Sequence, residues 1–516
     1  MQKKDQIIIL NFGSQTTQLI AKSIRSLGIY SQILDSQTPA TKIKKIKPCG
    51  IIFSGGPNSV TQKKSPRPDP AVYKLNIPIL GICYGLQLIT QKFSGQVAPG
   101  KNQKEYGQAK LTLKQKNNTL IKNLPDQSFV WMSHGDEINQ PPKDFKVIAS
   151  TAHSPYAIVA RPKKNIYAVQ FHPEVTHTQF GQQILRNFAI NICGCAQTWQ
   201  TPEIIQFLIQ KTKRIAQGRQ VLHAISGGVD STVMAEILHQ ALGHKLRCVM
   251  VDTGFLRQNE VEKTQKRFKK YLSCPVEVVN AREQFFNLVK NVQDAEKRRK
   301  LIGRQYIKIF LKLMGQNDLL AQGTLYPDVI ESASCGNSYH AHTIKTHHNR
   351  AQEVIKLMRQ NRVIEVFKNL FKDEVRAIGK KLQLPQEVVM RQPFPGPGLA
   401  IRILGPITKP KLRILKQADA IVIQQLKKSR LYYKISQTVV ALDSHQATCV
   451  KGDAREKGYL IFIRNISTQD FMTVAPYYLP RRIRENITTA ILNQVKGVGR
   501  VLFDESTKPP ATICYM

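Results

Sequence analysis

Short runs of β-branched residues alternate with helical stretches in two separate parts of this chain of 516 residues. In the first part, apolar runs at 7–10, 50–53, 79–82 and 167–171 are typical of strands, and 15–27, 86–93 and 181–192 are typical of helices. In the second part, the same patterns predict strands at 221–225 and 246–251 with a helix at 231–241 between them. This alternation predicts α/β folds with parallel sheets.

Two segments interrupt these patterns. The stretch 193–202 separates the two alternating parts, and the proline- and glycine-rich segment 393–398 cannot lie inside a helix. A chain of this length also needs roughly two to four hydrophobic cores. The sequence therefore predicts an α/β protein with two parallel-sheet domains, at 1–197 and 198–390, followed by a smaller α+β domain at 391–516.

The charge of the chain is strongly positive, with 76 Lys and Arg against 35 Asp and Glu and a formal net charge of +41. Affinity for nucleic acid is one explanation. A lysine-rich bias over solvated faces is the other, and we favour it because basic residues occur along the whole chain. The nine cysteines lack metal-ligand spacing, and no apolar run approaches the ~20 residues that span a bilayer. We expect a cytoplasmic protein with free thiols and no membrane or nucleic-acid partner.

Cys83 lies between Gly81 and Gly85, after an apolar run and before a predicted helix. This order is typical of a nucleophile elbow, in which the helix N-terminus favours a thiolate and a neighbouring backbone N–H can stabilise an oxyanion. A buried structural cysteine beside two turn glycines explains the segment equally well. The downstream His172 and Glu174 favour the nucleophile, because such a cysteine needs a base and the base needs an orienting acceptor.

Two further segments suit a site around this cysteine. Ser54-Gly55-Gly56-Pro57 can offer backbone amides, and 132–136 can line a polar pocket. Gly-x-Cys-x-Gly-x-Gln, together with the later His-Pro-Glu, resembles the class I glutamine amidotransferases over about 7–192. The resemblance implies a Cys83–His172–Glu174 triad that works through a glutamyl thioester. The implied glutamine pocket and oxyanion site comprises Gly56, Tyr84, Gln87, Ser133 and His134.

A second motif, Ser226-Gly227-Gly228-Val229-Asp230-Ser231, joins a predicted strand to a predicted helix. Backbone amides at a glycine-rich turn, hydroxyl groups and a helix N-terminus all suit phosphate. The loop lacks the Gly-Lys-Ser/Thr ending of a Walker loop. Asp230 is a candidate Mg²⁺ contact. Asp252, which ends the next predicted strand, belongs to the same sheet edge.

This loop resembles that of the ATP pyrophosphatases, which cleave ATP between the α and β phosphates and adenylate an oxygen. The resemblance implies an ATP site with Mg²⁺ and without a tightly bound organic cofactor. His347 and His348 lie near Lys345, but no ligand cluster accompanies them, so we interpret Lys345 as a phosphate partner on a lid. The expected ATP-binding residues are Ser226, Gly227, Gly228, Val229, Asp230, Ser231, Thr232, Asp252, Gly323 and Lys345.

The acceptor depends on the order of motifs along the whole chain. The ATP loop alone also occurs in NAD synthases, asparagine synthetases and tRNA thiolases. Together with 367–376, 391–399 and 508–512, however, the chain resembles the glutamine-hydrolysing GMP synthase family from end to end. The resemblance implies that XMP, ATP and glutamine are substrates, and that the last domain forms a homodimer. The implied XMP-binding residues are Arg299, Gln437, Asp453 and Lys508.

Two departures from the family pattern concern the acceptor side. Cys514 stands where the family has a substrate-contacting glutamate, and 442–450 lacks the usual Leu-Pro-x-Arg/Lys-x-Val-Gly pattern. Loss of a carboxylate that hydrogen-bonds a ligand costs about 1.5–3 kcal/mol. Three hypotheses follow: a GMP synthase, a relative that kept both catalytic domains but acts on another acceptor, and a basic nucleic-acid-binding protein.

Overall fold

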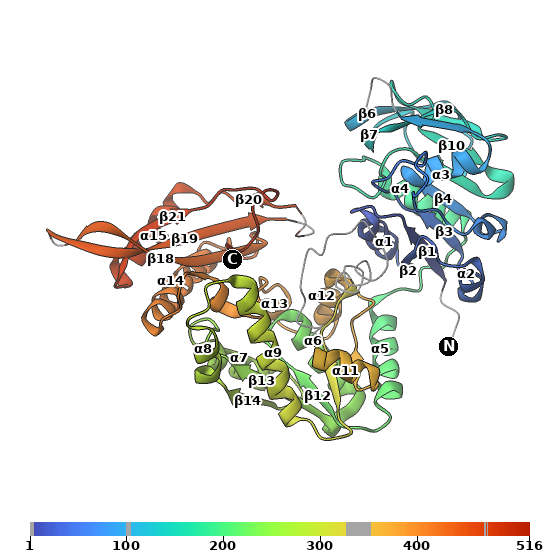
Figure 1. Ribbon diagram of the computed structural model, residues 1–516. Coiled ribbons are helices and arrows are strands. Elements are labelled where there is room, and N and C mark those ends of the chain that lie inside the picture. Colours follow the sequence, from blue (N-terminus) through green and yellow to red (C-terminus); the bar gives the residue numbers. More distant parts are fainter. Residues whose placement is uncertain are drawn as a thin grey trace. The chain divides into compact units, whose positions relative to one another are not determined.

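The chain forms two compact units, Met1–Ile204 and Ile205–Met516, each with its own hydrophobic core (Figure 1). The computed structural model describes residues 5–99, 105–326, 352–451, 453–468, 471 and 473–515. None of the helices in these ranges combines the length and the apolar character that crossing a membrane requires.

A nine-stranded sheet forms the centre of the first unit, with strand order β2-β1-β3-β4-β11-β10-β9-β6-β7. The first five strands in this order are parallel, and the other four are antiparallel. The parallel strands are β1 (Gln6–Asn11), β2 (Tyr30–Asp35), β3 (Gly50–Phe53), β4 (Ile79–Ile82) and β11 (Ile166–Val169). The antiparallel strands are β10 (Ile158–Arg161), β9 (Lys146–Ser150), β6 (Glu105–Leu113) and β7 (Gln127–His134).

The sequence predicts four of the five parallel strands of this sheet (β1, β3, β4 and β11) but neither the edge strand β2 nor the antiparallel strands, and differences in burial accompany this division. Every residue of β3, β4 and β11 is buried, as expected for parallel strands that are covered on both faces. Strand β7 instead alternates buried and more exposed residues, as expected for a strand that is covered on one face. The remaining elements are β5 (Gln96–Pro99), β8 (Asp136–Gln140), α1 (Thr17–Ser26), α2 (Ala40–Ile46), α3 (Tyr84–Lys92) and α4 (Gly181–Arg186), which continues as a π-helix over Asn187–Ile192.

The second unit begins with a five-stranded sheet of order β14-β13-β12-β15-β16, and all its strands are parallel, as predicted. The strands are β12 (Val221–Ala224), β13 (Leu246–Asp252), β14 (Val276–Asn280), β15 (Leu319–Gln322) and β16 (Val363–Glu365). The helices are α5 (Thr201–Ala216), which enters from the first unit, α6 (Val229–Leu242), α7 (Glu260–Tyr271), α8 (Arg282–Val289), α9 (Ala295–Leu313), α11 (Gln352–Arg359), α12 (Lys372–Lys381) and α13 (Gln386–Val389).

The C-terminal part of this unit is built on a long antiparallel hairpin, β18 (Gln437–Lys451) and β19 (Ala454–Ser467). Strands β17 (Ile403–Leu404), β20 (Ala475–Pro476) and β21 (Val498–Phe503) complete its sheet, and α14 (Lys409–Lys428) and α15 (Arg481–Gln494) pack together against it. A single hydrophobic core contains residues from both sides of position 390: Val249, which lies in β13, Val440, which lies in β18, and Leu399, which lies between these strands in the sequence. The boundary predicted at 390 therefore divides residues that share a core, and the three-domain division remains a proposal.

Asp419 of α14 is buried between two arginines that come from different parts of this unit. Its Oδ1 lies 3.3 Å from Nη1 of Arg402, and its Oδ2 lies 3.4 Å from Nε of Arg257, which follows β13. Both guanidinium groups lie 4.9 Å from the ring centroid of Phe394. Arg402 is 0% exposed and Asp419 is 1% exposed, so the carboxylate balances buried positive charge.

We expect the Asp419→Asn substitution to lower the free energy of unfolding of the second unit by about 3–5 kcal/mol, because it leaves buried guanidinium charge without a counterion. Urea unfolding measures this change. The matched control is Glu283→Gln, which breaks the exposed Lys409–Glu283 pair and should cost at most about 1 kcal/mol. Equal effects of the two substitutions would contradict this account.

Candidate active sites

Cys83 occupies a strained turn between β4 and α3. Its φ of 53° and ψ of −104° lie outside the regions that non-glycine residues favour. A Cβ at Gly81 would lie 2.7 Å from the backbone of Gly85, and a Cβ at Gly85 would lie 2.6 Å from the carbonyl oxygen of Phe53. Both positions therefore need glycine for the turn to pack against the sheet. The N–H of Cys83 donates to the carbonyl of Val169 at 2.8 Å, which fixes the turn next to β11.

The structure brings Cys83, His172 and Glu174 together in a nearly dry site, where they are 4%, 7% and 7% exposed. Nδ1 of His172 lies 2.8 Å from Oε1 of Glu174, and the ring also hydrogen-bonds with the Cys83 side chain. Thr16, which no sequence motif marks, donates its hydroxyl to the same Glu174 oxygen at 2.6 Å. Because 158 residues separate these two partners, no local spacing could reveal the contact.

Opposing effects act on the His172 imidazole. Burial is the largest of them and favours the neutral ring. The charge of Glu174 and the hydrogen bond with Cys83 outweigh burial, so the pKa of His172 lies well above its usual value of 6.5. The ring is therefore able to hold a proton between the thiol and the carboxylate, as a histidine that transfers protons must.

Several residues expected in the glutamine pocket surround this site. The carbonyl oxygen of Ser133 accepts from Sγ of Cys83 at 3.6 Å, and Gln87 is buried one turn along α3. A Cβ at Gly56 would lie 2.6 Å from the carbonyl oxygen of Phe12, so only glycine allows this loop to approach β1. Ser54 of the same segment fixes the loop through its side chain, because its hydroxyl accepts from the N–H of Phe12 at 3.0 Å and donates to the carbonyl of Gly55 at 2.8 Å.

Two pocket residues have side chains that are engaged elsewhere. The Tyr84 hydroxyl donates to the carbonyl of Pro66 at 2.9 Å, so its backbone N–H, in the first turn of α3, is the part that suits an oxyanion. Nδ1 of His134 lies 3.0 Å from the carbonyl oxygen of Asp136, and its Nε2 lies 3.4 Å from Oε2 of Glu105. Both ring nitrogens of His134 therefore face protein groups.

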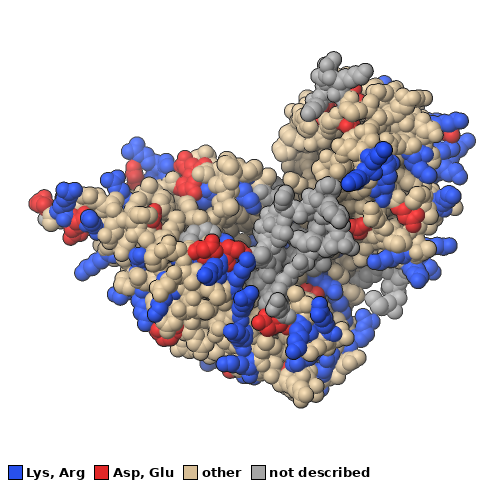
Figure 2. All heavy atoms as spheres, in the orientation of Figure 1, with Lys and Arg blue, Asp and Glu red and all other residues tan. Residues whose placement is uncertain are grey.

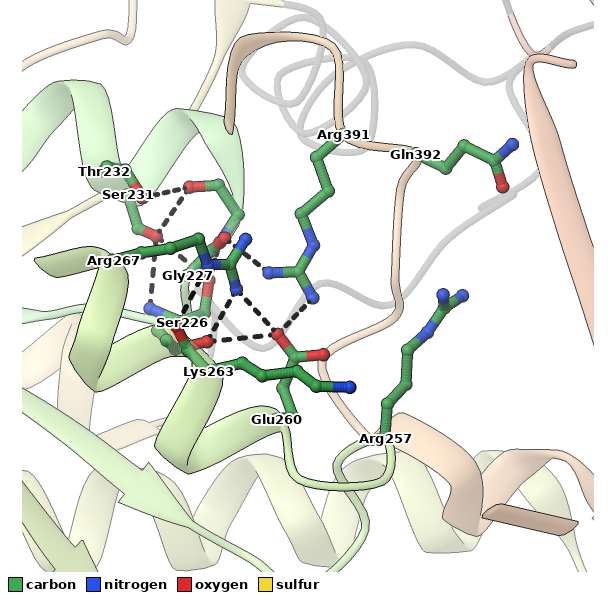
Figure 3. Close-up of polar contacts among 12 residues, drawn as sticks. Ser226, Gly227, Ser231, Thr232, Arg257, Glu260, Lys263, Arg267, Arg391 and Gln392 are labelled. Carbon is green, nitrogen blue, oxygen red and sulfur yellow. Dashed lines mark hydrogen bonds and ion pairs between the residues drawn. The ribbon is translucent and has the colours of Figure 1, made fainter. Parts of the chain in front are cut away.

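In the second unit, the residues 226–228 join β12 to α6, which begins at Val229. Oγ of Ser231 accepts from the N–H of Ser226 at 3.1 Å, and the Thr232 hydroxyl donates to the carbonyl of Gly228 at 2.8 Å (Figure 3). These two hydroxyls stabilise the loop. Oδ2 of Asp230 lies 3.1 Å from Nζ of Lys372, whereas its buried Oδ1 has no hydrogen-bond partner among the described residues.

The other expected ATP residues lie at the carboxyl ends of the neighbouring strands. Oδ2 of Asp252 accepts from Nε of Arg282 at 2.6 Å, and its Oδ1 accepts from the N–H of Gly254 at 2.9 Å. Gly323 directly follows β15. A cavity of about 340 Å³ opens beside this edge, lined in part by 252–262 and by residues of α8 and α14. Lys345 and the histidine pair beside it lie outside the described residues.

A group of charged residues that no sequence motif marked lies next to the loop 226–228 (Figure 3). Nη1 of Arg391 donates to the carbonyl oxygen of Gly227 at 2.7 Å, and its Nη2 lies 2.8 Å from Oε1 of Glu260. Nη2 of Arg267 lies 3.0 Å from the same oxygen of Glu260. Burial acts to raise the pKa of Glu260, but Arg391 and Arg267 outweigh it and lower the pKa, so Glu260 is a carboxylate.

The four residues expected to bind XMP are not all brought together within one chain. Gln437 opens β18 and is 6% exposed, whereas Asp453 lies in the turn at the other end of the hairpin. At about 3.3 Å per residue, β18 separates them by roughly 45 Å. Nζ of Lys508 donates to the carbonyl oxygen of Phe471 at 2.7 Å, and Arg299 lies on α9, 3.6 Å from Glu296. Within a single chain, Asp453 and Gln437 therefore do not lie in one site.

We expect Glu174→Gln to lower the pKa of His172, because the substitution removes the negative charge and weakens the hydrogen bond that raise it. Titration of histidine-labelled protein by NMR measures the change, and the His172→Asn variant assigns the signal. Glu105→Gln is the matched control, since that carboxylate contacts His134, and it should leave the His172 titration in place. An unchanged midpoint in Glu174→Gln would refute the electrostatic account.

Comparison with known proteins places these two sites in context. Residues 8–192 match the family described as "Glutamine amidotransferase class-I", and residues 424–515 match "GMP synthase C terminal domain". The crystal structure of a putative GMP synthase subunit from Thermoplasma acidophilum is 32% identical, with a TM-score of 0.34, and covers 37% of this chain and 94% of its own.

Full-length relatives extend the similarity over both units. A protein of Aquifex aeolicus named "GMP synthase [glutamine-hydrolyzing]" is 44% identical over 99% of this chain and 99% of its own length. A protein of Lactobacillus delbrueckii with the same name is 44% identical over 99% of this chain and 98% of its own. The chain thus belongs to the family of glutamine-hydrolysing GMP synthases, which are ATP-using ligases.

Proposed function

We propose that this chain makes GMP from XMP, with glutamine as the nitrogen donor and with Cys83, His172 and Glu174 as the catalytic residues of the glutamine half-reaction. The observation that carries the proposal is the buried array in which Glu174 contacts His172 and His172 contacts Cys83. It occurs in a chain that relatives named GMP synthase match over nearly their whole length.

In the glutamine half-reaction, the Cys83 thiolate attacks the carboxamide carbon of glutamine, and the resulting oxyanion accepts hydrogen bonds from the N–H groups of Gly56 and Tyr84. The His172 imidazolium donates its proton to the departing ammonia, which leaves a glutamyl thioester. His172 then takes a proton from water as the water attacks the thioester, and glutamate leaves. Gln87, Ser133 and His134 line the glutamine pocket in this proposal.

In the ATP half-reaction, the loop from Ser226 to Thr232 binds the phosphates of ATP. The buried, unpartnered Oδ1 of Asp230 suits a hard cation, so Asp230 is the residue that would hold Mg²⁺ together with the ATP phosphates. Mg²⁺ supplies charge neutralisation for the phosphates. Val229, Asp252, Gly323 and Lys345 complete the proposed ATP site.

The same half-reaction needs adenylation because the C2 oxygen of XMP is a poor leaving group. This oxygen attacks the α phosphate of ATP, and pyrophosphate leaves. Ammonia then displaces AMP at C2 to give GMP. Ammonia must reach C2 without being protonated in bulk water, and the reaction therefore requires a route that excludes solvent.

The XMP site needs a second copy of the chain in this proposal. Arg299, Gln437 and Lys508 bind XMP in one chain, and Asp453 reaches a partner because its own hairpin carries it roughly 45 Å from Gln437. The exposed Val450 near the hairpin tip is 71% accessible, which suits a contact between copies. We therefore propose that 391–516 forms a homodimer. This proposal keeps the three domains that the sequence predicts, with boundaries after 197 and after 390.

We also propose that the chain works in the cytoplasm and that nucleic acid is not its partner. The eight cysteines among the described residues are all free, which fits a reducing cytoplasm.

On the face shown in Figure 2, Lys and Arg are spread over both units with Asp and Glu among them. This distribution favours a lysine-rich surface over a nucleic-acid site.

Cys83→Ala should abolish GMP formation with glutamine and leave GMP formation with ammonium salts close to that of the unchanged protein. The substitution removes the nucleophile but leaves the phosphate loop intact. The assay follows XMP-dependent formation of GMP and AMP with each nitrogen source. Cys193→Ala, at a cysteine outside the triad, is the control and should retain both activities. Undiminished use of glutamine by Cys83→Ala would refute the triad.

Cys514→Glu should lower the KM for XMP by about ten- to a hundredfold, because it restores the carboxylate that family members have at this position. The measurement is GMP formation with ammonia at varied XMP, and Cys514→Ser is the control of native size without a carboxylate. A screen of other acceptors belongs to the same experiment. Faster turnover of another acceptor than of XMP by the unchanged chain would favour the hypothesis of a changed substrate.

A further inference from the structure

Arg391 and Gln392 are adjacent residues whose side chains run in different directions (Figure 3). Arg391 reaches the phosphate loop after β12, and Gln392 reaches the residues that lead into β18. The dipeptide thus lies between the proposed ATP site and the strand that begins with Gln437. No role in catalysis or binding follows for either residue from the motifs described above.

The contact of Arg391 determines the orientation of one peptide group in the phosphate loop. Its Nη1 donates to the carbonyl oxygen of Gly227 at 2.7 Å. The carbonyl of Gly227 and the N–H of Gly228 belong to the same planar peptide and point in opposite directions. By holding the carbonyl, Arg391 directs the Gly228 N–H away from itself, toward Oγ of Ser226, which accepts from it in a long hydrogen bond of 3.4 Å. The positive charge on the guanidinium also polarises the peptide, which makes this N–H a stronger donor to phosphate.

Residues of α7 hold Arg391 in this position. Oε1 of Glu260 lies 2.8 Å from Nη2 of Arg391, and it accepts from the Thr264 hydroxyl at 3.1 Å and from Nη2 of Arg267 at 3.0 Å. Gly227 fits closely against this group, since a Cβ there would lie 3.0 Å from Cγ2 of Thr264 and 3.3 Å from Nη1 of Arg391. The Arg391 side chain is only 12% exposed, so its rotamer is restricted.

Gln392 forms several hydrogen bonds with the segment that leads into β18. Its Nε2 donates to the carbonyls of Tyr432 at 2.9 Å and Ile435 at 3.2 Å, and its Oε1 accepts from the N–H of Thr438 at 2.9 Å. Its own N–H lies 3.3 Å from the Tyr432 hydroxyl. The residue is 5% exposed, and the side-chain amide thereby fixes the start of β18, where Gln437 precedes Thr438.

We propose that Arg391 and Gln392 are positioning residues that set the phosphate loop relative to the acceptor-binding strand. Arg391 orients the Gly227–Gly228 peptide toward the phosphates, and Gln392 holds the β18 end of the same segment. Transfer of the adenylyl group needs the α phosphate and the acceptor oxygen within about 3–3.5 Å of each other, so a loose connection would slow it. The inference rests on the proposed function, because it takes 226–232 as the ATP site and Gln437 as an XMP contact.

The Arg391 half of the proposal is tested by the binding of magnesium pyrophosphate to the full chain, measured by calorimetry without any acceptor. Arg391→Met should raise the Kd by about ten- to a hundredfold, since it removes a charge-assisted hydrogen bond to the loop. Arg391→Lys should have an intermediate effect, because one ammonium group cannot reproduce the fork that joins Gly227 to Glu260. Arg359→Met is the control at an exposed arginine of α11 and should leave the Kd unchanged.

The Gln392 half is tested by kinetics with ammonia as the nitrogen source. Gln392→Met keeps the size of the side chain but removes its three hydrogen bonds, and it should lower kcat/KM for XMP by about tenfold or more. The same variant should bind pyrophosphate within twofold of the unchanged chain. Loss of folding would instead change both measurements together, and thermal unfolding of each variant detects it.

Two results would overturn the proposal: a pyrophosphate Kd in Arg391→Met within twofold of the unchanged chain, or unaltered kcat/KM for XMP in Gln392→Met. Failure of the proposed function has a different signature. In that case the unchanged chain makes no GMP from XMP and ammonia, while pyrophosphate binding still reports on Arg391.

Discussion

Both candidate sites depend on one geometric constraint, which is that the carboxyl ends of parallel strands meet at a common edge of a sheet. In the first unit Cys83 follows β4, the loop with Gly56 follows β3 and His172 comes soon after β11. In the second unit the loop 226–228, for which we propose phosphate binding, follows β12, and Asp252 and Gly323 lie at the ends of the two neighbouring strands. Residues far apart in the sequence thereby become neighbours without any long loop.

The two sites use this edge for different electrostatic tasks. The first is nearly dry and combines a thiol, an imidazole and a carboxylate, and the charge of Glu174 with the Cys83 contact keeps the pKa of His172 high despite burial. The second presents backbone amides beside Arg391, Arg267 and the carboxylate of Glu260. A proton-transfer site benefits from excluding water, whereas a phosphate site benefits from fixed positive charge.

Buried polar contacts connect the parallel sheet of the second unit to its C-terminal part. The segment 391–402 contains Arg391, Gln392, Phe394 and Arg402, and each of these contacts a different neighbour. Asp419 of α14 forms ion pairs with both Arg402 and Arg257, so removing Asp419 leaves buried guanidinium charge without compensation. Such contacts specify geometry more narrowly than apolar packing does, because hydrogen bonds are directional.

The sequence by itself indicated the strands β1, β3, β4, β11, β12 and β13, the turn at Cys83 and the glycine-rich turn that opens α6, because short-range patterns of burial and turn chemistry lie in adjacent residues. It did not show the edge strand β2 or the antiparallel strands β6, β7, β9 and β10. In β6 and β7 exposed residues alternate with less exposed ones, which weakens the apolar signal. Only the tertiary structure decided that Thr16 orients Glu174, that Arg391 holds Gly227 and that Asp453 is remote from Gln437. These relations join residues many positions apart, and sheet order and hairpin length, rather than any local pattern, set the distances between them.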